Sequence, residues 1–213
     1  MIRSLSLAAG LLFACSSQAA VIMGNLASTT PGDPLLFGST TSINPSQAKA
    51  AVFSVDQSLR LEQVFLGLSN FNNDDTFDIF IGSLSGNSIT SLQALELLAP
   101  TRTADNSARV WEFGPTGGDL LLDPGTDYAL TLTASVGSYT WGRVGNDPVT
   151  PTGLATFGGY YFSTDSGTTF ASSTDPNLTN SFTIIGAEVP VPAPALLLML
   201  AMLPLLRMVR RRR

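Results

Sequence analysis

The chain of 213 residues contains no histidine and a single cysteine, and only 13% of its residues are charged. An average globular protein has about 25% charged residues. The absence of histidine excludes a histidine general base, a Ser-His-Asp triad and a zinc site with histidine ligands. Because 16 Asp and Glu residues outnumber 11 Lys and Arg residues, the chain also lacks the basic surface that binding to nucleic acid requires. We therefore expect one main domain with its own core and no nucleic-acid partner.

The first 19 residues have the features of a secretory signal peptide. Arg3 supplies the positive charge, residues 4–14 form a short apolar segment, and Ser17 and Ala19 place small residues before a cleavage site at Ala20. Two alternatives remain open: a buried N-terminal helix, and a lipoprotein signal in which Cys15 becomes lipidated. The signal peptide predicts export.

A second targeting segment occupies residues 189–213. Residues 195–206 are uncharged, and at about 1.5 Å per residue they extend about 18 Å, less than the ~30 Å hydrocarbon core. Counted from Ala193 to Val209, the helix extends about 25 Å, at the lower limit of spanning. A basic membrane stop accompanies it, made of Arg207, Arg210, Arg211, Arg212 and Arg213. The positive-inside rule places this end in the cytoplasm and residues 20–188 outside.

A short proline motif precedes this apolar segment: Val189, Pro190, Val191, Pro192 and Ala193. Motif, apolar helix and arginine cluster together resemble the PEP-CTERM sorting signal, in its VPLPA-type variant, with Val191 where Glu is usual. The resemblance implies a Gram-negative bacterium that makes exopolysaccharide, and a partner of the exosortase type, a membrane-embedded cysteine protease. It also implies transient anchoring in the inner membrane and delivery to the cell surface or the extracellular matrix of a biofilm. An ordinary C-terminal anchor behind a proline-rich linker is the alternative.

The body between these segments, residues 20–188, is acidic and free of cysteine. Five basic residues stand against sixteen acidic ones, a net charge of −11, and no disulfide or thiol chemistry is available. Strand-like alternation covers residues 59–68, 76–81, 109–113, 127–133 and 181–184, and further strands are expected at 20–24, 50–55, 92–98, 138–143 and 155–162. The alternation changes phase near Gln63, which predicts a β-bulge there, and residues 92–98 would also fit a short helix. The sequence therefore predicts an all-β fold, a β-sandwich of the jelly-roll kind, flanked by the signal peptide and the C-terminal hydrophobic helix.

Residues 122–132 read LDPGTDYALTL and are followed by Tyr139–Gly142. With the strand at 76–81, this order of features resembles the choice-of-anchor domains that accompany PEP-CTERM tails. The resemblance covers residues 50–186 and implies an extracellular β-sandwich module with no assigned activity.

The densest group of oxygen ligands consists of Asn72, Asp74, Asp75 and Asp78. Ca²⁺ prefers such ligands, although the spacing lacks the central glycine of an EF-hand. The alternative is a solvated loop rich in Asx turns. Calcium is therefore the one cofactor that the sequence suggests.

Aromatic residues gather around the glycine-rich segment 153–159, namely Tyr139, Trp141, Tyr160, Tyr161 and Phe162. Flat aromatic rings suit a sugar-binding face, whereas the alternative is packing in the core. Hydrolysis of a glycoside needs two carboxylates about 5 to 10 Å apart, and Glu62, Glu96 and Glu112 offer no selective pair. The sequence predicts a non-enzymatic structural or adhesive surface protein. A carbohydrate-binding module for exopolysaccharide is the first alternative and a glycoside-active enzyme the second.

Overall fold

The computed structural model describes residues 18–73, 76–102, 106–143, 148–175 and 178–189. Within these ranges the chain forms strands and no helix. The strands are β1 (Ala19–Gly24), β2 (Ser39–Ile43), β3 (Ala48–Val55), β4 (Leu59–Ser69), β5 (Thr76–Ser85), β6 (Ser88–Ala99), β7 (Arg109–Pro115), β8 (Leu120–Leu122), β9 (Asp127–Val136), β10 (Tyr139–Arg143), β11 (Thr150–Pro151), β12 (Ala155–Ser163), β13 (Ala171–Ser172) and β14 (Phe182–Glu188). The all-β prediction is confirmed, and residues 92–98 belong to a strand, β6.

The alternation of the sequence is reproduced in the strands that it predicted. Ile79 and Ile81 of β5 and Leu130 and Leu132 of β9 are buried in the core, because alternate side chains of a strand point to the same face. The bulge near Gln63 is also confirmed. The register of β4 against β14 pairs Gln63 with Ile185 and Leu61 with Gly186, which leaves one extra residue on β4.

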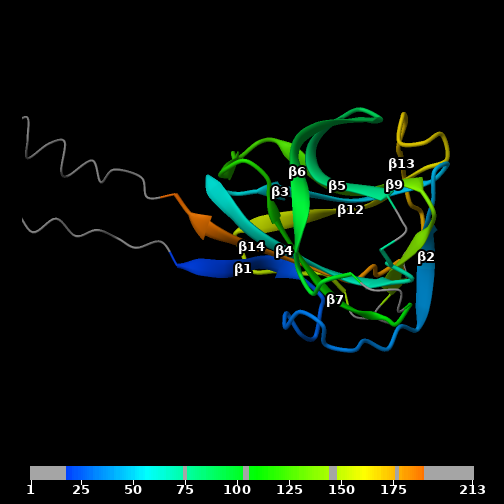
Figure 1. Cartoon of the computed structure of the whole chain (residues 1–213). Coiled ribbons are helices and arrows are strands. Elements are labelled where there is room, and N and C mark those ends of the chain that lie inside the picture. The colour runs from blue at the N-terminus through cyan, green and yellow to red at the C-terminus, as the bar shows by residue number, and fades with distance from the viewer. Residues whose placement is uncertain (1–17, 74–75, 103–105, 144–147, 176–177, 190–213) are drawn as a thin grey trace, which may run out of the picture. The chain divides into compact units, whose positions relative to one another are not determined.

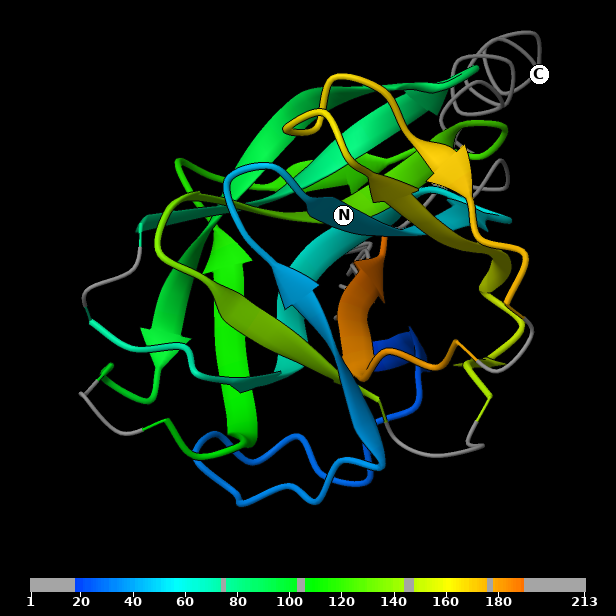
Figure 2. The same ribbon diagram turned by 90° about the vertical axis from the view of Figure 1, so that its right-hand side faces the viewer.

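One antiparallel sheet contains all the strands, in the order β11-β1-β14-β4-β7-β6-β5-β9-β3-β12-β13, with β8 and β10 on β4 and β2 on β10. The sheet curls, because β6 pairs with β5 up to Ala94 and with β7 from Leu95 onward. Figure 2 shows the strands of the two halves curling around a shared interior. The jelly-roll arrangement stays a prediction, and the helix predicted in 189–213 lies outside the described residues.

The core lies between the two halves of the curled sheet. Its largest fully buried side chains are Trp111, Trp141, Tyr139, Phe53, Phe71, Phe113 and Phe182. Each such side chain contributes roughly 1.5–3 kcal/mol when it leaves water. The body, Ala19–Glu188, is one compact unit, and this core replaces the disulfides that it lacks.

The outer face of the sheet beside β10 is covered by the segment between β1 and β2. Phe37 of this segment packs against Gly142 of β10 and Gly67 of β4. A Cβ atom on Gly142 would overlap the ring of Phe37, so this ring can sit here only because residue 142 has no side chain.

The first and last strands of the body are neighbours. β1 pairs antiparallel with β14, with Ala19 opposite Ala187 and Ala20 opposite Gly186 (Figure 1). β14 in turn pairs with β4, so the last strand is an interior strand of the sheet. The N-terminal end of β1 and the C-terminal end of β14 therefore lie side by side.

Candidate functional site

The aromatic residues proposed for a sugar-binding face are mostly in the core. Tyr139 and Trp141 are 0% exposed and Tyr160 is 6% exposed, so these three side chains form no exposed platform. That part of the prediction is wrong, and the alternative of core packing applies. Tyr161 is half-buried and packs beside Phe170 on the outer face of the sheet.

Each of the three buried rings uses its polar atom to bind a backbone carbonyl. The Tyr139 hydroxyl donates to a carbonyl of β9 at 2.9 Å, Trp141 Nε1 donates to Ser181 at 2.8 Å, and the Tyr160 hydroxyl donates to Asn180 at 2.7 Å. Buried Tyr and Trp side chains usually find such partners. Burial raises the pKa of the Tyr160 phenol, which keeps it a donor at neutral pH.

Asn180 and Ser181 are the centre of a buried polar cluster that joins four strands. Thr41 Oγ1 donates to Asn180 Oδ1 at 3.0 Å, and Asn25 Nδ2 donates to the Asn180 carbonyl at 3.1 Å. The Ser181 hydroxyl donates to the Gly142 carbonyl at 2.9 Å. With the bonds from Trp141 and Tyr160, this cluster connects β2, β10, β12 and the start of β14, so its role is to position strands.

The proposed calcium ligands are only partly described. Asp74 and Asp75 lie outside the described residues, Asn72 is half-buried, and Asp78 is exposed on β5. In the part of the chain that the structure describes, no group of three or more His, Cys, Asp or Glu residues could hold a metal ion. Calcium binding stays a prediction.

Two of the three glutamates considered for catalysis form polar contacts with neighbouring side chains. Glu62 Oε1 lies 2.7 Å from Arg60 Nη2, and Glu112 Oε1 accepts a hydrogen bond from Gln63 Nε2 at 2.6 Å. Glu96 is exposed on β6.

Asp165 organises the turn between β12 and β13. Its carboxylate accepts hydrogen bonds from the Ser163 hydroxyl at 2.6 Å and from the Thr169 hydroxyl and backbone N–H at 2.6 and 2.9 Å. These bonds, that of Ser163 first, lower the pKa of Asp165 to about 2. The turn contains Ser166 and Gly167 in the left-handed region, with φ of 62° and 84°.

The targeting segments are not described beyond their junctions with the body. Val189 follows β14, whereas Pro190, Val191, Pro192, Ala193 and the five arginines lie outside the described residues. In the part of the chain that the structure describes, no helix is long and apolar enough to cross a membrane.

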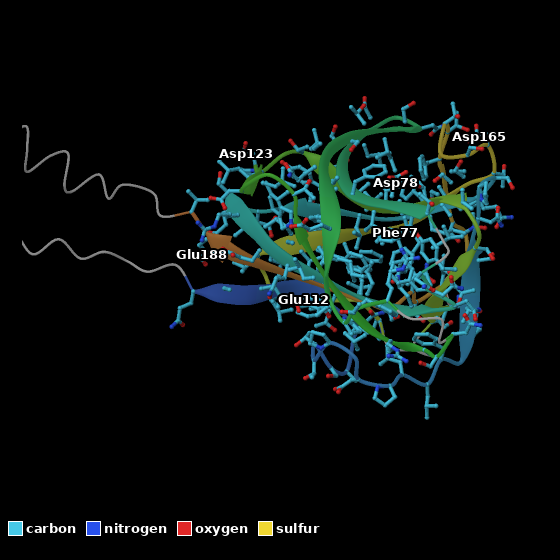
Figure 3. All side chains as sticks on the ribbon, in the orientation of Figure 1. Phe77, Asp78, Glu112, Asp123, Asp165 and Glu188 are labelled. Atoms are coloured by element: carbon cyan, nitrogen blue, oxygen red, sulfur yellow. The ribbon has the colours of Figure 1, made fainter. Side chains whose placement is uncertain are left out.

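A hollow with a volume of about 330 Å³ lies beside β5 and is the candidate binding site. It is lined by Phe77, Asp78, Ile79, Phe80, Ser91, Ala94, Leu95 and Thr133. Figure 3 labels Phe77 and Asp78 on β5, beneath the curled hairpin of β5 and β6.

The hollow opens where β6 leaves β5. The pairing of the two strands ends at Phe80 and Ala94, and the Ala94 carbonyl then accepts hydrogen bonds from the backbone N–H and the hydroxyl of Thr116, each at 3.0 Å. Among the described strands, none pairs with β5 on this side between Thr76 and Ile79. The departure of β6 toward β7 therefore leaves the space.

Sequence reasoning missed Phe80, Ser91 and Thr133 as site residues. A signal for the direction of Phe80 was present, because the alternation that turns Ile79 and Ile81 inward turns Phe80 to the same outward face as Asp78. The positions of Ser91 and Thr133 depend on strand pairing across the chain.

No protein-family model, no curated protein and no solved structure matches this chain.

Proposed function

We propose that this protein is an exported bacterial protein with a structural or adhesive role at the cell surface or in the extracellular matrix. An exosortase-type protease processes its C-terminal signal at the motif of Val189, Pro190, Val191, Pro192 and Ala193. The curled sheet is its rigid module, of the jelly-roll sandwich type.

The observation that supports this proposal is the pairing of β1 with β14. Ala20, the residue that follows the predicted cleavage site, lies opposite Gly186, so the chain enters and leaves the body at neighbouring points. A signal peptide before β1 and a sorting segment after β14 are thus both attached at one end of the body, which leaves the loops at the other ends of the strands accessible to partners.

The proposed role is not catalytic. Of the residues that line the hollow, Asp78 is the one with a carboxylate, whereas glycoside hydrolysis needs two. Glu62 and Glu112 are engaged on the surface with Arg60 and Gln63.

The processing step is tested by mass spectrometry of the exported protein in the native host. We expect an N-terminus at or near Ala20 and a C-terminus near residues 189–193. The double substitution Pro190→Ala, Pro192→Ala should leave uncleaved protein in the membrane fraction. The matched control is Pro148→Ala, Pro151→Ala, two exposed prolines of the body, which should be processed normally. An exported protein that still ends at Arg213 would contradict the proposal.

The structural or adhesive role is tested separately in a strain that lacks the protein. We expect weaker attachment to surfaces or a matrix that disperses more easily, restored by the wild-type chain and not by the unprocessed double variant. Unchanged attachment and matrix cohesion would refute this role.

A further inference from the structure

The hollow beside β5 presents an aromatic ring, a carboxylate and a hydroxyl-bearing rim on the same face of the sheet. Asp78 and Phe80 are two residues apart on β5, so both point outward. Thr133 of β9 lies opposite Asp78, and Ser91 of β6 lies opposite Gly82 of β5. Three strands therefore supply the polar and aromatic groups of one concave surface.

The polar groups of this surface differ in what they still offer a ligand. Thr133 Oγ1 donates its proton to the Asp78 backbone carbonyl at 3.1 Å, so the hydroxyl oxygen is left as an acceptor. The Asp78 carboxylate is exposed and can accept several hydrogen bonds. Ser91 is exposed and can both donate and accept. Such a surface is rich in acceptors and suits a ligand rich in hydroxyl donors.

We propose that this hollow binds a pyranose unit of a neutral polysaccharide. The C–H face of the sugar packs on the half-buried ring of Phe80, and its hydroxyls donate to the Asp78 carboxylate and contact Ser91. A volume of about 330 Å³ lies at the lower end of the range of ligand pockets, which suits one sugar ring and its linkages. Tyr139, Trp141 and Tyr160 are not among the lining residues of the hollow, and their burial excludes them from contact with a polymer.

Charge decides between neutral and acidic polysaccharides. The body carries a net charge of −11, and Asp78 lies in the hollow itself. A uronic-acid polymer would place its carboxylates beside Asp78 and within the negative field of the body, which opposes binding. A neutral polymer brings hydroxyls without that repulsion.

The open edge of β5 also raises the question of peptide binding by strand addition. The unpaired stretch covers only Thr76–Ile79, which is short compared with the usual five to six residues of a strand. The outward ring and carboxylate beside it favour the saccharide.

The test is affinity electrophoresis in native gels that contain dextran, galactomannan or xyloglucan as neutral probes, or alginate as the acidic probe. The full chain is used in a zwitterionic detergent without a sugar headgroup, and the exported mature protein is run beside it. We expect at least one neutral probe to retard the protein and alginate not to. Retardation by alginate alone, or by none of the neutral probes, would overturn the proposal.

Variants locate the site. Phe80→Ala and Asp78→Asn should each weaken retardation about tenfold, since a hydrogen bond to a charged group or a ring contact is worth roughly 1.4 kcal/mol or more. The matched controls are Phe162→Ala, an exposed ring on β12, and Asp127→Asn, an exposed carboxylate on β9, which should bind as the wild type does.

One further variant covers the case in which Phe80→Ala fails to fold. Ser91→Ala changes an exposed position and leaves the core intact, and it should weaken retardation about threefold. Wild-type binding by Asp78→Asn and Ser91→Ala together would place the saccharide elsewhere and refute the site. Sorting of the protein is measured independently by its mature termini, so failure of saccharide binding leaves the proposed processing unaffected.

Discussion

The contact of Phe37 with Gly142 allows a sharp test of how the segment between β1 and β2 covers the outer face of the sheet. Gly142→Ala adds a methyl group where the ring of Phe37 now lies. Residue 142 is in a strand and has no left-handed φ, so alanine brings no backbone strain of its own. The cost comes from the displaced ring, and overpacking of this kind costs about 2 kcal/mol.

The reverse change empties the same space. Phe37 is half-buried, so Phe37→Ala loses about half of the ~1.5–3 kcal/mol of a fully buried Phe, or about 1 kcal/mol. In the double variant the methyl group on residue 142 meets no ring, so the total loss should stay near 1 kcal/mol. Independent effects would sum to about 3 kcal/mol, and the expected coupling is therefore about 2 kcal/mol.

The cycle is measured by urea unfolding of the mature protein, followed by tryptophan fluorescence. Both tryptophans, Trp111 and Trp141, are buried and report on the core. Leu36→Ala is the control, because Leu36 is 97% exposed in the same segment and its change should add to that of Gly142→Ala without coupling. Additive effects of Phe37→Ala and Gly142→Ala would refute the reasoning.

Two further predictions concern stability. Because the pKa of Asp165 is about 2 in the folded protein and 3.8 ordinarily, its carboxylate stabilises the fold above about pH 4, and this contribution is lost as the pH falls toward 2. Thermal unfolding between pH 6 and pH 2 should show a smaller acid-induced loss for Asp165→Asn than for the wild type, with Asp127→Asn as control; equal losses for Asp165→Asn and the wild type would contradict it. Trp141→Phe should cost about 1–2 kcal/mol in urea unfolding, since it removes the 2.8 Å bond to Ser181 and leaves a gap in the core. Trp111→Phe should lower the stability less than Trp141→Phe does, since the hydrogen bond from Trp111 to a backbone carbonyl is longer, at 3.3 Å. A larger loss for Trp111→Phe would show that ring packing, and not the hydrogen bond, sets the cost of these substitutions.

Local patterns predicted the strands well because alternation and turn chemistry act over a few residues. The phase change near Gln63 identified a bulge that the pairing of β4 with β14 contains. The face of β12 to which the Tyr160 side chain points was harder to predict from the sequence. The pairing of β12 with β3 shifts register between Phe157 and Gly159, and this bulge turns both Phe157 and Tyr160 toward the core. Alternation read through that glycine-rich stretch cannot assign the face of Tyr160.

The residues of the candidate site also divide into those that local alternation places and those that only strand pairing places. The sequence identified Asp78 as a possible calcium ligand, and the alternation of the strand at 76–81 puts Asp78 and Phe80 on the same face. Thr133 and Ser91 join them only through strand pairing with β9 and β6, at separations that local patterns do not report.

The sequence by itself determined the all-β character, the inward faces of most strands and the acidic charge of the body, and it predicts the two targeting segments at the ends. Each of these follows from composition or from a pattern within a dozen residues. The tertiary structure decided that β14 lies between β1 and β4, that β6 carries the sheet from one half to the other, and that Phe37 rests on Gly142. These features depend on which distant surfaces bury each other best, and that choice is made only when the whole sheet curls around one core.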